Sequence, residues 1–384
     1  MYYVFLLGGA FCAVATAFHF VSILVVSSRF GKRDIGPIDD TAGVSILRPV
    51  CGVENFVEET LLSTFQLAYP RYEIVFCAAD ANDPVIPCVR RLMAEHPCIE
   101  SRLLIGNSDA SANPKLNNLA KGWREAQYNW VLMVDSNVSM PKDHLQRMLS
   151  IWRNDTGLVC SPPIGGEPDG AWAELECAFL NTYQARWQCF ADTLGFGFAQ
   201  GKAMLWRRDM LDAAGGIAAL GSELAEDAAA TKIVRKLGLH VRLVANPFIQ
   251  PLGYRRAAEV WHRQVRWARL RRSTFKLFFI PEIFVGILPP LAVGTALLTA
   301  AGWPVIDAAV PYVLAWYAAE LFLAWRGGWQ LSVWSLPMWI VRDVVSPALW
   351  IAAWTGDDFE WRGNAMNVET RALSCEFVVK HQSP

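Results

Sequence analysis

The chain has 384 residues, and its net charge of −1 lacks the basic excess that nucleic-acid binding requires. Hydrophobic residues make up 53% of the sequence, which indicates membrane segments beside a folded polar domain. The nine cysteines contain no CxxC pair, which argues against a zinc site and against a disulfide framework. A reducing compartment therefore fits the polar domain best.

The first segment, residues 1–28, carries no charged side chain and is long enough to cross a bilayer as a helix. Arg29, Lys32 and Arg33 follow at once. A signal peptide is the alternative, because Ala13-Val14-Ala15 resembles a cleavage site. However, no basic residue precedes the apolar run, and apolar sequence continues past Ala15. We predict a membrane anchor over 1–28, with the residues after it on the cytoplasmic side.

Residues 42–275 form the predicted polar domain, which follows a linker rich in Gly and Pro over 28–41. Strand-like and helix-like stretches alternate in it. The strands are predicted at Val44–Val50, Tyr72–Ala79, Ser101–Ile105, Trp130–Val134 and Gly157–Cys160, and the helices at Glu54–Leu67, Pro84–Glu95, Pro114–Gln127 and Pro141–Trp152. This order predicts an α/β fold with a mainly parallel sheet and helices on both faces. Ligands of such sheets bind beyond the carboxyl ends of the strands.

Acidic residues follow two of these strands. Asp80 and Asp83 come after Tyr72–Ala79, where carboxylates can accept hydrogen bonds from a base or a ribose. An ordinary turn before Pro84 is the alternative. Asp135 ends Trp130–Val134 and opens Asp-Ser-Asn, a reasonable ligand set for a divalent cation that also binds a diphosphate. For Asp135 the alternative is a turn or a helix cap.

Two helix starts carry further candidates. Lys115 lies in Asn113-Pro-Lys-Leu-Asn-Asn118, where a lysine and a helix N-terminus together favour an anion, with a surface loop as the alternative. Glu226-Asp227 begins a predicted helix that ends at Lys236. Asp227 is placed there as a general base for an acceptor hydroxyl, although acidic residues are common in the first turn of any helix.

A basic-aromatic pentad, Arg263-Gln-Val-Arg-Trp267, stands where the polar domain meets the apolar C-terminal third. Arg263 and Arg266 share one helix face. A guanidinium group matches phosphate oxygens, and an indole suits a sugar ring or a lipid headgroup. The alternative is a basic juxtamembrane helix that contacts anionic lipid.

Residues 277–355 hold three long apolar stretches. Ile283–Ile306 carries no charge, Val310–Trp325 is broken only by Glu320, and Trp329–Trp354 is broken by Arg342 and Asp343. They predict two to four further membrane or interfacial segments. The adjacent Arg342 and Asp343 leave open whether the last one is a span or an interfacial helix. Residues 356–384 are predicted to be a tail.

Taken in order, these motifs resemble the ceramide glucosyltransferase family, which consists of membrane-anchored inverting glycosyltransferases with a Rossmann-like GT-A fold. The family signature has three separated aspartates and a (Q/R)xxRW pentad, and it matches Asp83, Asp135, Asp227 and Arg263–Trp267. The NPKLNN segment, the Ala-Glu-Asp segment that ends in the last aspartate and a Tyr-Pro-Arg-Tyr-Glu lead-in match as well. Asp135 is followed by Ser-Asn rather than by a second Asp, which leaves the number of metal-binding carboxylates open.

The resemblance implies transfer of glucose from UDP-glucose to the primary hydroxyl of ceramide, with inversion at the anomeric carbon. Asp227 would be the general base. Asp135 would hold Mg²⁺ or Mn²⁺ on the diphosphate, and this cation would neutralise the leaving UDP together with Lys115.

The remaining candidates receive binding roles from the same resemblance. Asp80 and Asp83 would hold the uridine side of the donor. Arg266 would reach the diphosphate, Trp267 would line the acceptor entrance, and Arg263 is a weaker candidate for the same work.

The partners implied are a nucleotide sugar, a lipid acceptor and the bilayer. Other readings stay open: diacylglycerol or a hopanoid as the acceptor, a processive polysaccharide synthase, or a non-catalytic membrane protein that binds lipid-linked sugar. The sequence does not distinguish glucose from other hexoses.

Overall fold

The computed structural model describes residues 1–31, 42–106, 108, 111–361 and 364–367. Most of the predicted linker over 28–41 and most of the predicted tail over 356–384 lie outside the described residues. The chain divides into two compact units. We name them the helical unit (Met1–Gly31, Gly165–Phe190 and Tyr254–Ala365) and the sheet unit (Lys32–Ile164, Ala191–Gly253 and Met366–Pro384).

The sheet unit is built on seven strands in the order β3-β2-β1-β4-β7-β5-β8. Their bounds are β1 Val44–Val50, β2 Tyr72–Ala78, β3 Ser101–Ile105, β4 Trp130–Val134, β5 Thr156–Cys160, β7 Ala203–Arg207 and β8 His240–Leu243. Neighbouring strands are parallel except at β7, which runs antiparallel to β4 and β5. The predicted α/β fold with a mostly parallel sheet is therefore confirmed, with one antiparallel strand that the sequence did not predict.

Helices cover both faces of this sheet. Successive side chains of a strand point to opposite faces, so the apolar strands have a face to bury on each side. Ile46 of β1 packs into a core with helices α2 (Val57–Phe65), α3 (Ile86–Glu95) and α5 (His144–Ser150). The adjacent Leu47 packs into a second core with α4 (Pro114–Glu125), α8 (Arg208–Ala213) and α10 (Glu226–Lys236). The strand tips are held between two apolar layers, which fixes the position of the polar residues that follow them.

Several elements were not predicted or differ in kind. Besides β7, β8 and α8, the elements that were not predicted are β6 (Ile164–Asp169), α9 (Gly216–Ala219), the 3-10 turn η2 (Leu220–Ser222) and β9 (Ile249–Tyr254). Residues 171–193 form three successive helical segments, α6 (Ala171–Ala178), the π-helix η1 (Phe179–Ala185) and α7 (Arg186–Thr193). The short strands β10 (Asp358–Trp361) and β11 (Asn364–Asn367) end the described chain.

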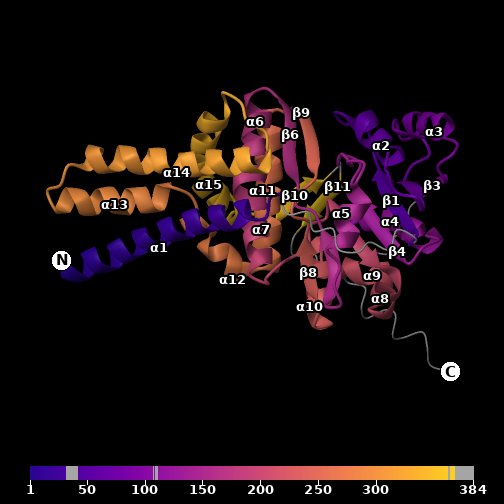
Figure 1. Ribbon diagram of the computed structural model, residues 1–384, viewed down its shortest axis with the longest axis horizontal. Helices are drawn as coiled ribbons and strands as arrows, with labels where there is room; N and C mark the ends of the chain where they lie inside the picture. Colours follow the sequence, from indigo (N-terminus) through magenta and orange to yellow (C-terminus); the bar gives the residue numbers. More distant parts are fainter. Residues whose placement is uncertain (32–41, 107, 109–110, 362–363, 368–384) are drawn as a thin grey trace. The chain divides into compact units, whose positions relative to one another are not determined.

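The helical unit contains the long apolar helices. Helices α1 (Tyr2–Ser27), α13 (Leu288–Ala300) and α14 (Val305–Gly327) lie alongside one another (Figure 1). Helix α15 (Ser335–Trp354) packs against α6 and α11 (Ala257–Thr274). Helix α1 continues unbroken past the cleavage-like Ala13-Val14-Ala15.

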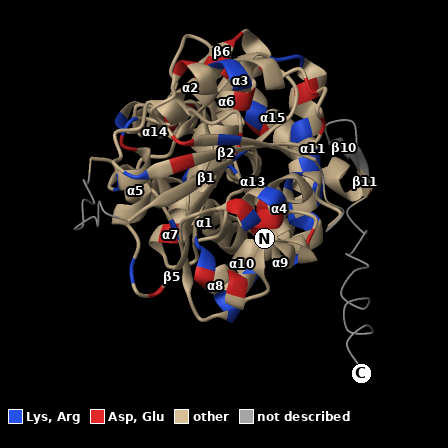
Figure 2. Ribbon diagram, turned by 90° about the vertical axis from the view of Figure 1, so that its right-hand side faces the viewer, with Lys and Arg blue, Asp and Glu red and all other residues tan. Residues whose placement is uncertain are grey.

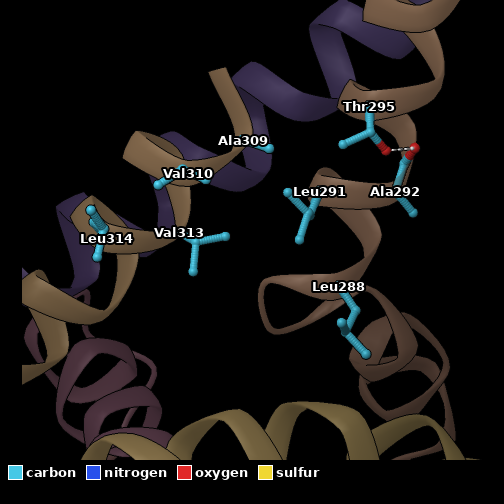
Figure 3. A pocket seen from close by; sticks show the side chains of 8 residues that line it. All are labelled: Leu288, Leu291, Ala292, Thr295, Ala309, Val310, Val313 and Leu314. Atoms are coloured by element: carbon cyan, nitrogen blue, oxygen red, sulfur yellow. Dashed lines mark hydrogen bonds between the residues drawn. The ribbon is translucent and has the colours of Figure 1, made fainter. Parts of the chain in front are cut away.

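Three helices of the described chain are long and apolar enough to cross a membrane: α1, α14 and α15. A fourth candidate is the bent pair Lys276–Phe284 and Leu288–Ala300, which meet at 45°. The first part of that pair consists of α12 (Lys276–Phe279) and a 3-10 turn, η3 (Ile280–Phe284). An apolar groove of about 670 Å³ separates α13 from α14 and is lined by residues such as Leu291, Val310 and Leu314 (Figure 3).

The charged pair that interrupts the last apolar stretch lies inside α15, which is one continuous helix. Arg342 is buried and donates through both terminal nitrogens to the Glu320 carboxylate of α14, at 2.9 Å each. Its Nε donates to Oδ1 of Asp343 at 2.9 Å. The charges are paired within the unit, so they do not prevent α15 from being a candidate span.

Candidate active site

Helix α4 places Lys115 next to the tip of strand β4. The Asn113 side chain caps the helix by accepting hydrogen bonds from the backbone N–H groups of Lys115 (2.9 Å) and Leu116 (3.2 Å). Pro114 occupies the first helical turn, where its missing N–H costs nothing. This capped start, rather than an exposed loop, is the local structure of the NPKLNN segment.

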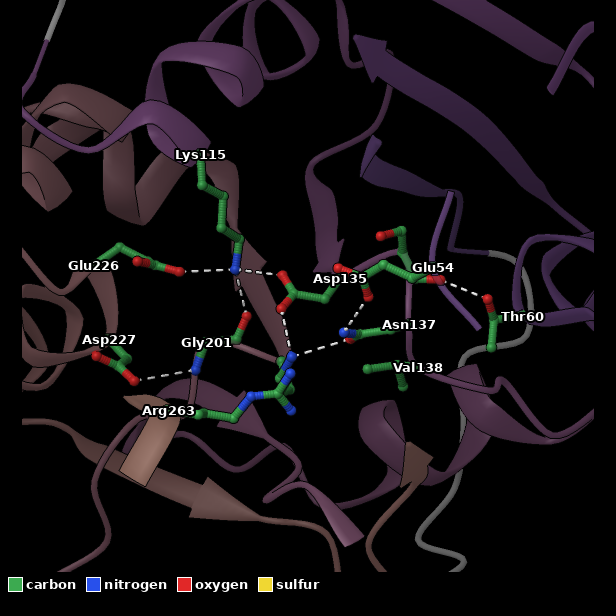
Figure 4. A network of polar contacts seen from close by, with 12 residues as sticks. Glu54, Thr60, Lys115, Asp135, Asn137, Val138, Gly201, Glu226, Asp227 and Arg263 are labelled. Carbon is green, nitrogen blue, oxygen red and sulfur yellow. Dashed lines mark hydrogen bonds and ion pairs between the residues drawn. The ribbon is translucent and has the colours of Figure 1, made fainter. Parts of the chain in front are cut away.

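The Lys115 ammonium group has an acceptor for each of its three hydrogens. Its Nζ lies 2.6 Å from Oδ1 of Asp135, 2.7 Å from Oε1 of Glu226 and 2.6 Å from the carbonyl oxygen of Gly201 (Figure 4). An ammonium group has three N–H donors and no more. Lys115 therefore joins the end of β4 to the start of α10, and it meets an anion only by giving up one of these partners.

Asp135 is held in its ionised form. Burial alone would raise its pKa, but the charges of Lys115 and Lys202 outweigh burial and hold the pKa of Asp135 well below its usual range. Burial alone would lower the pKa of Lys115, but the carboxylates of Asp135 and Glu226 outweigh burial and raise this pKa above its usual value. The pair stays charged across the physiological range.

Asp227 has the opposite electrostatics although it belongs to the same cluster. Its Oδ2 accepts from the backbone N–H of Gly201 at 3.3 Å, and its Oδ1 accepts from that of Ala228 at 2.8 Å. Burial raises the pKa of Asp227 to about 7, and the negative charge of the neighbouring Glu226 adds to the effect. A carboxylate with a pKa near neutrality is suited to accept a proton at physiological pH.

Lys202, which the sequence did not indicate as a site residue, and Asn137, which it placed beside Asp135 at a predicted cation site, complete this cluster. Lys202 Nζ lies 3.0 Å from Oδ2 of Asp135 and 3.0 Å from Oδ1 of Asn137. The Asn137 amide nitrogen donates to Oε2 of Glu54 at 3.0 Å, which turns the amide oxygen toward the lysine (Figure 4). The apolar run directly after Gly201-Lys202 could have predicted β7, and with it a lysine at a strand end.

Asp80 and Asp83 lie at the end of β2 and make turn contacts. Both carboxylate oxygens of Asp83 accept from the backbone N–H of Gly52, at 2.9 and 3.0 Å, and Oδ1 also accepts from Val85 N–H at 2.9 Å. Asp80 accepts from Asn82 N–H at 2.9 Å. The Asn82 and Val85 bonds shape the turn, the Gly52 bonds join it to the segment that follows β1, and the predicted contact with a nucleotide stays a prediction.

The pentad lies on α11 of the helical unit, whose basic residues appear as blue segments in Figure 2. Arg263 forms an ion pair with Glu176, whose buried carboxylate also lies 3.5 Å from Nε of Arg255. The predicted phosphate contact of Arg263 would therefore require it to leave a buried partner. Arg266 and Trp267 are half-buried on the same helix, and their predicted roles remain predictions.

Among the described residues, no group of three or more His, Cys, Asp or Glu side chains is arranged to hold a metal ion. At Asp135, oxygen donors come from one carboxylate and one amide, and a lysine already lies where they converge. Both oxygens of Asp135 pair with ammonium groups, Oδ1 with Lys115 and Oδ2 with Lys202, so a cation that takes oxygen ligands would have to displace a lysine. The predicted metal ligand thus lies in a donor set that does not fit a divalent cation in this arrangement.

The chain matches the family model described as "Glycosyl transferase family 21" over residues 9–373. It is 25% identical over 334 residues to "Ceramide glucosyltransferase 3" of Caenorhabditis elegans, covering 85% of this chain and 72% of the relative. It is 27% identical to "Ceramide glucosyltransferase" of Komagataella phaffii, covering 89% and 86%. The mannosyltransferase PcManGT from Pyrobaculum calidifontis, solved in complex with GDP-Man and Mn²⁺, is 20% identical with a TM-score of 0.49 and covers 90% and 96%.

Proposed function

The chain belongs to glycosyltransferase family 21, and we propose that it transfers glucose from UDP-glucose to the primary hydroxyl of ceramide. The observation that carries the proposed chemistry is Asp227, a carboxylate whose pKa is raised to about 7 beside a lysine-held cluster at the sheet edge. The proposed acceptor follows the relatives named ceramide glucosyltransferase, which match most of this chain.

In the proposed step, the lipid hydroxyl oxygen attacks the anomeric carbon of the sugar. The bond from that carbon to the diphosphate breaks, and its electron pair leaves with UDP. The hydroxyl proton passes to the Asp227 carboxylate, which returns it to solvent. A single displacement inverts an α-linked donor to a β-linked product, so one base and one charge-neutralising site are enough.

Lys115 has a positioning role in this proposal. Its three hydrogens are engaged by Asp135, Glu226 and Gly201, so it holds the two ends of the cluster together. Because the Asp135 donor set does not fit Mg²⁺ or Mn²⁺ in this arrangement, we assign no step to a divalent cation. Asp80, Asp83 and Arg266 are proposed to contact the donor, and Trp267 to line the acceptor entrance.

The proposed location is an integral membrane protein with its sheet unit on the cytoplasmic side. Three to four candidate spans support the first part. The second part follows the excess of basic residues near the ends of the apolar segments: Arg29 follows α1, and five arginines of α11 precede α12. A protein placed in this way meets a soluble nucleotide sugar and a membrane lipid from one side.

Lipid extracts of a host that expresses the full chain, with and without added ceramide, test the proposal. The Asp227→Asn variant is the matched inactive control. The expected result is a new hexosylceramide that needs both the chain and ceramide, and from which a β-glucosidase releases glucose. A new hexosyl-diacylglycerol or hexosyl-hopanoid would replace the acceptor, and no new glycolipid with any lipid would contradict the activity.

A further inference from the structure

The ladder between strands β4 and β7 places Lys202 directly opposite Asp135. Val134 pairs with Ala203 in the antiparallel register, and the backbone N–H of Asp135 continues the pairing by donating to the Lys202 carbonyl oxygen at 3.0 Å. The two side chains therefore start from neighbouring positions at one sheet edge, and the backbone pairing keeps them together.

The Lys202 ammonium group lies at the point where two oxygens converge. Oδ2 of Asp135 and Oδ1 of Asn137 are each 3.0 Å from its Nζ. Arg48 of β1 supports the turn between them by donating to the Thr60 carbonyl oxygen at 2.9 Å and to that of Ser136 at 3.4 Å. The two oxygens thus bind one cation, and this cation is the ammonium group of a lysine of the chain itself.

The two lysines of the cluster differ in what holds them. Lys115 is tied to Glu226 and to the Gly201 carbonyl as well as to Asp135. Lys202 instead faces the Asp135 and Asn137 oxygens, and its side chain is 18% exposed against 10% for Lys115. A lysine with a flexible four-carbon stem can turn its point charge from a carboxylate to a phosphate.

We propose that Lys202 is a donor-binding residue. Its ammonium group, held by Asp135 and Asn137 in the free protein, binds the diphosphate of the nucleotide sugar at the position where the sequence predicts a divalent cation. This inference rests on the proposed function, because it assumes a nucleoside-diphosphate donor. It implies that nucleoside diphosphate binds to this chain without a metal ion.

Charge balance at the site supports this assignment. The positive charges of Lys115 and Lys202 equal the negative charges of Asp135 and Glu226, and Asp227 is only half ionised near its pKa of about 7. Removal of the Lys202 charge leaves an excess of negative charge facing an anionic donor. Loss of one charge-assisted hydrogen bond of this type weakens binding by about 10- to 100-fold.

Calorimetric titration of the full-length chain in detergent with UDP, in buffer containing EDTA, tests the inference. The wild-type chain is expected to bind UDP, Lys202→Met to bind it about 10- to 100-fold more weakly, and Lys202→Arg to keep part of the affinity. Lys232→Met is the matched control, because Lys232 is an exposed lysine of the same unit that pairs with Glu223 at 2.6 Å. Thermal unfolding identifies any variant that fails to fold.

A second measurement does not depend on nucleotide or on activity. Electron paramagnetic resonance of added Mn²⁺ is expected to show tighter Mn²⁺ binding by Lys202→Met than by the wild type, because two oxygens lose their lysine. The inference is overturned if wild-type UDP binding is absent in EDTA and appears only with Mn²⁺. It is equally overturned if Lys202→Met binds UDP in EDTA as tightly as the Lys232→Met control.

Failure of the inference can be told apart from failure of the proposed function. The titration uses no acceptor, so a wrong lipid leaves it unaffected. If the wild-type chain binds GDP but not UDP, the proposed donor is wrong, and the same Lys202 comparison is then made with GDP.

Discussion

The pH dependence of transfer provides the sharpest test of Asp227 as the base. Burial, with the added charge of Glu226, raises its pKa from 3.8 to about 7. Only the ionised carboxylate accepts a proton, so kcat/KM is expected to reach a plateau above about pH 8, to stand at half of it at about pH 7 and to fall about tenfold for each pH unit below about pH 6. At pH 5 only about 1% of the molecules would carry the active form.

Replacing Glu226 by Gln removes one of the two causes of this shift and leaves the burial in place. The pKa of Asp227 is then expected to fall by roughly one unit, the lower end of the effect of a close charge. At pH 6 the variant would retain about 50% of its own plateau, against about 10% for the wild type. The acidic limb of the variant's pH profile thus moves to lower pH, and its rate at pH 6 relative to the plateau rises. Damage to the fold would not raise this relative rate.

The contacts of Glu226 determine which part of the variant's pH profile tests the prediction, the height of the plateau or the position of the acidic limb. A glutamine keeps an oxygen for Lys115, which lies 2.7 Å from Oε1, but it loses the acceptor that Asn113 Nδ2 reaches at 2.8 Å. The height of the plateau therefore responds to altered packing as well, and the position of the limb does not. Glu223→Gln is the control, since Glu223 lies three residues earlier and pairs with the exposed Lys232.

Initial rates with labelled UDP-glucose and ceramide in mixed micelles, taken between about pH 5 and pH 9, give the two profiles. Thermal unfolding at each pH separates loss of fold from loss of rate. A wild-type profile that stays flat down to pH 5 would refute the assignment of the base, and so would a limb that Glu226→Gln does not move.

Three further predictions concern neighbouring residues. Asp227→Asn should bind UDP as the wild type does and lose about 10²- to 10⁴-fold in kcat, measured by titration calorimetry and transfer assays; an unchanged kcat would contradict the base. Arg263→Met should lower the free energy of unfolding by about 3 kcal/mol in denaturant titrations, because it leaves the buried Glu176 carboxylate without its closest partner; equal stability would show that the pair is not structural. Gly201→Ala should destabilise the fold by about 1–3 kcal/mol, since its Cβ would lie 2.8 Å from Oε1 of Glu226, and a variant with normal thermal unfolding would show that the cluster can yield.

Five of the seven strands could be predicted nearly residue by residue, because β1, β2, β4 and β5 are short, almost fully buried runs bounded by turn residues and β3 is a short apolar run between two helices. Val44–Val50 and Trp130–Val134 match β1 and β4 at both ends. The run Ala203–Arg207 could also have been predicted as a strand, but its antiparallel pairing with β4 and β5 could not, since these strands lie far away in sequence. The antiparallel insertion of β7 is a long-range choice that no local pattern specifies.

At the candidate site, too, the local setting of each residue could be predicted from the sequence, and the contacts between the residues could not. The types and local settings of Lys115, Asp135 and Asp227 were readable, since each stands at a strand end or a helix start. Their mutual contacts were not, because Lys115 meets Glu226 across 111 positions of sequence. For the same reason the sequence favoured a phosphate contact for Arg263, whereas the fold supplies Glu176 as its partner.

The two carboxylates of the sheet edge show why residue type alone could not assign their roles. Asp135 lies between two ammonium groups and its pKa is held low, while Asp227 lies beside Glu226 and its pKa is raised to about 7. The charge of Lys115 lowers the pKa of both carboxylates, but at Asp227 burial and the negative charge of Glu226 outweigh it. A pair of carboxylates whose environments push their pKa values apart separates a permanent anion from a proton acceptor. The permanent anion can orient a cation, and Lys202 is the more exposed of the two lysines that the fold places beside it.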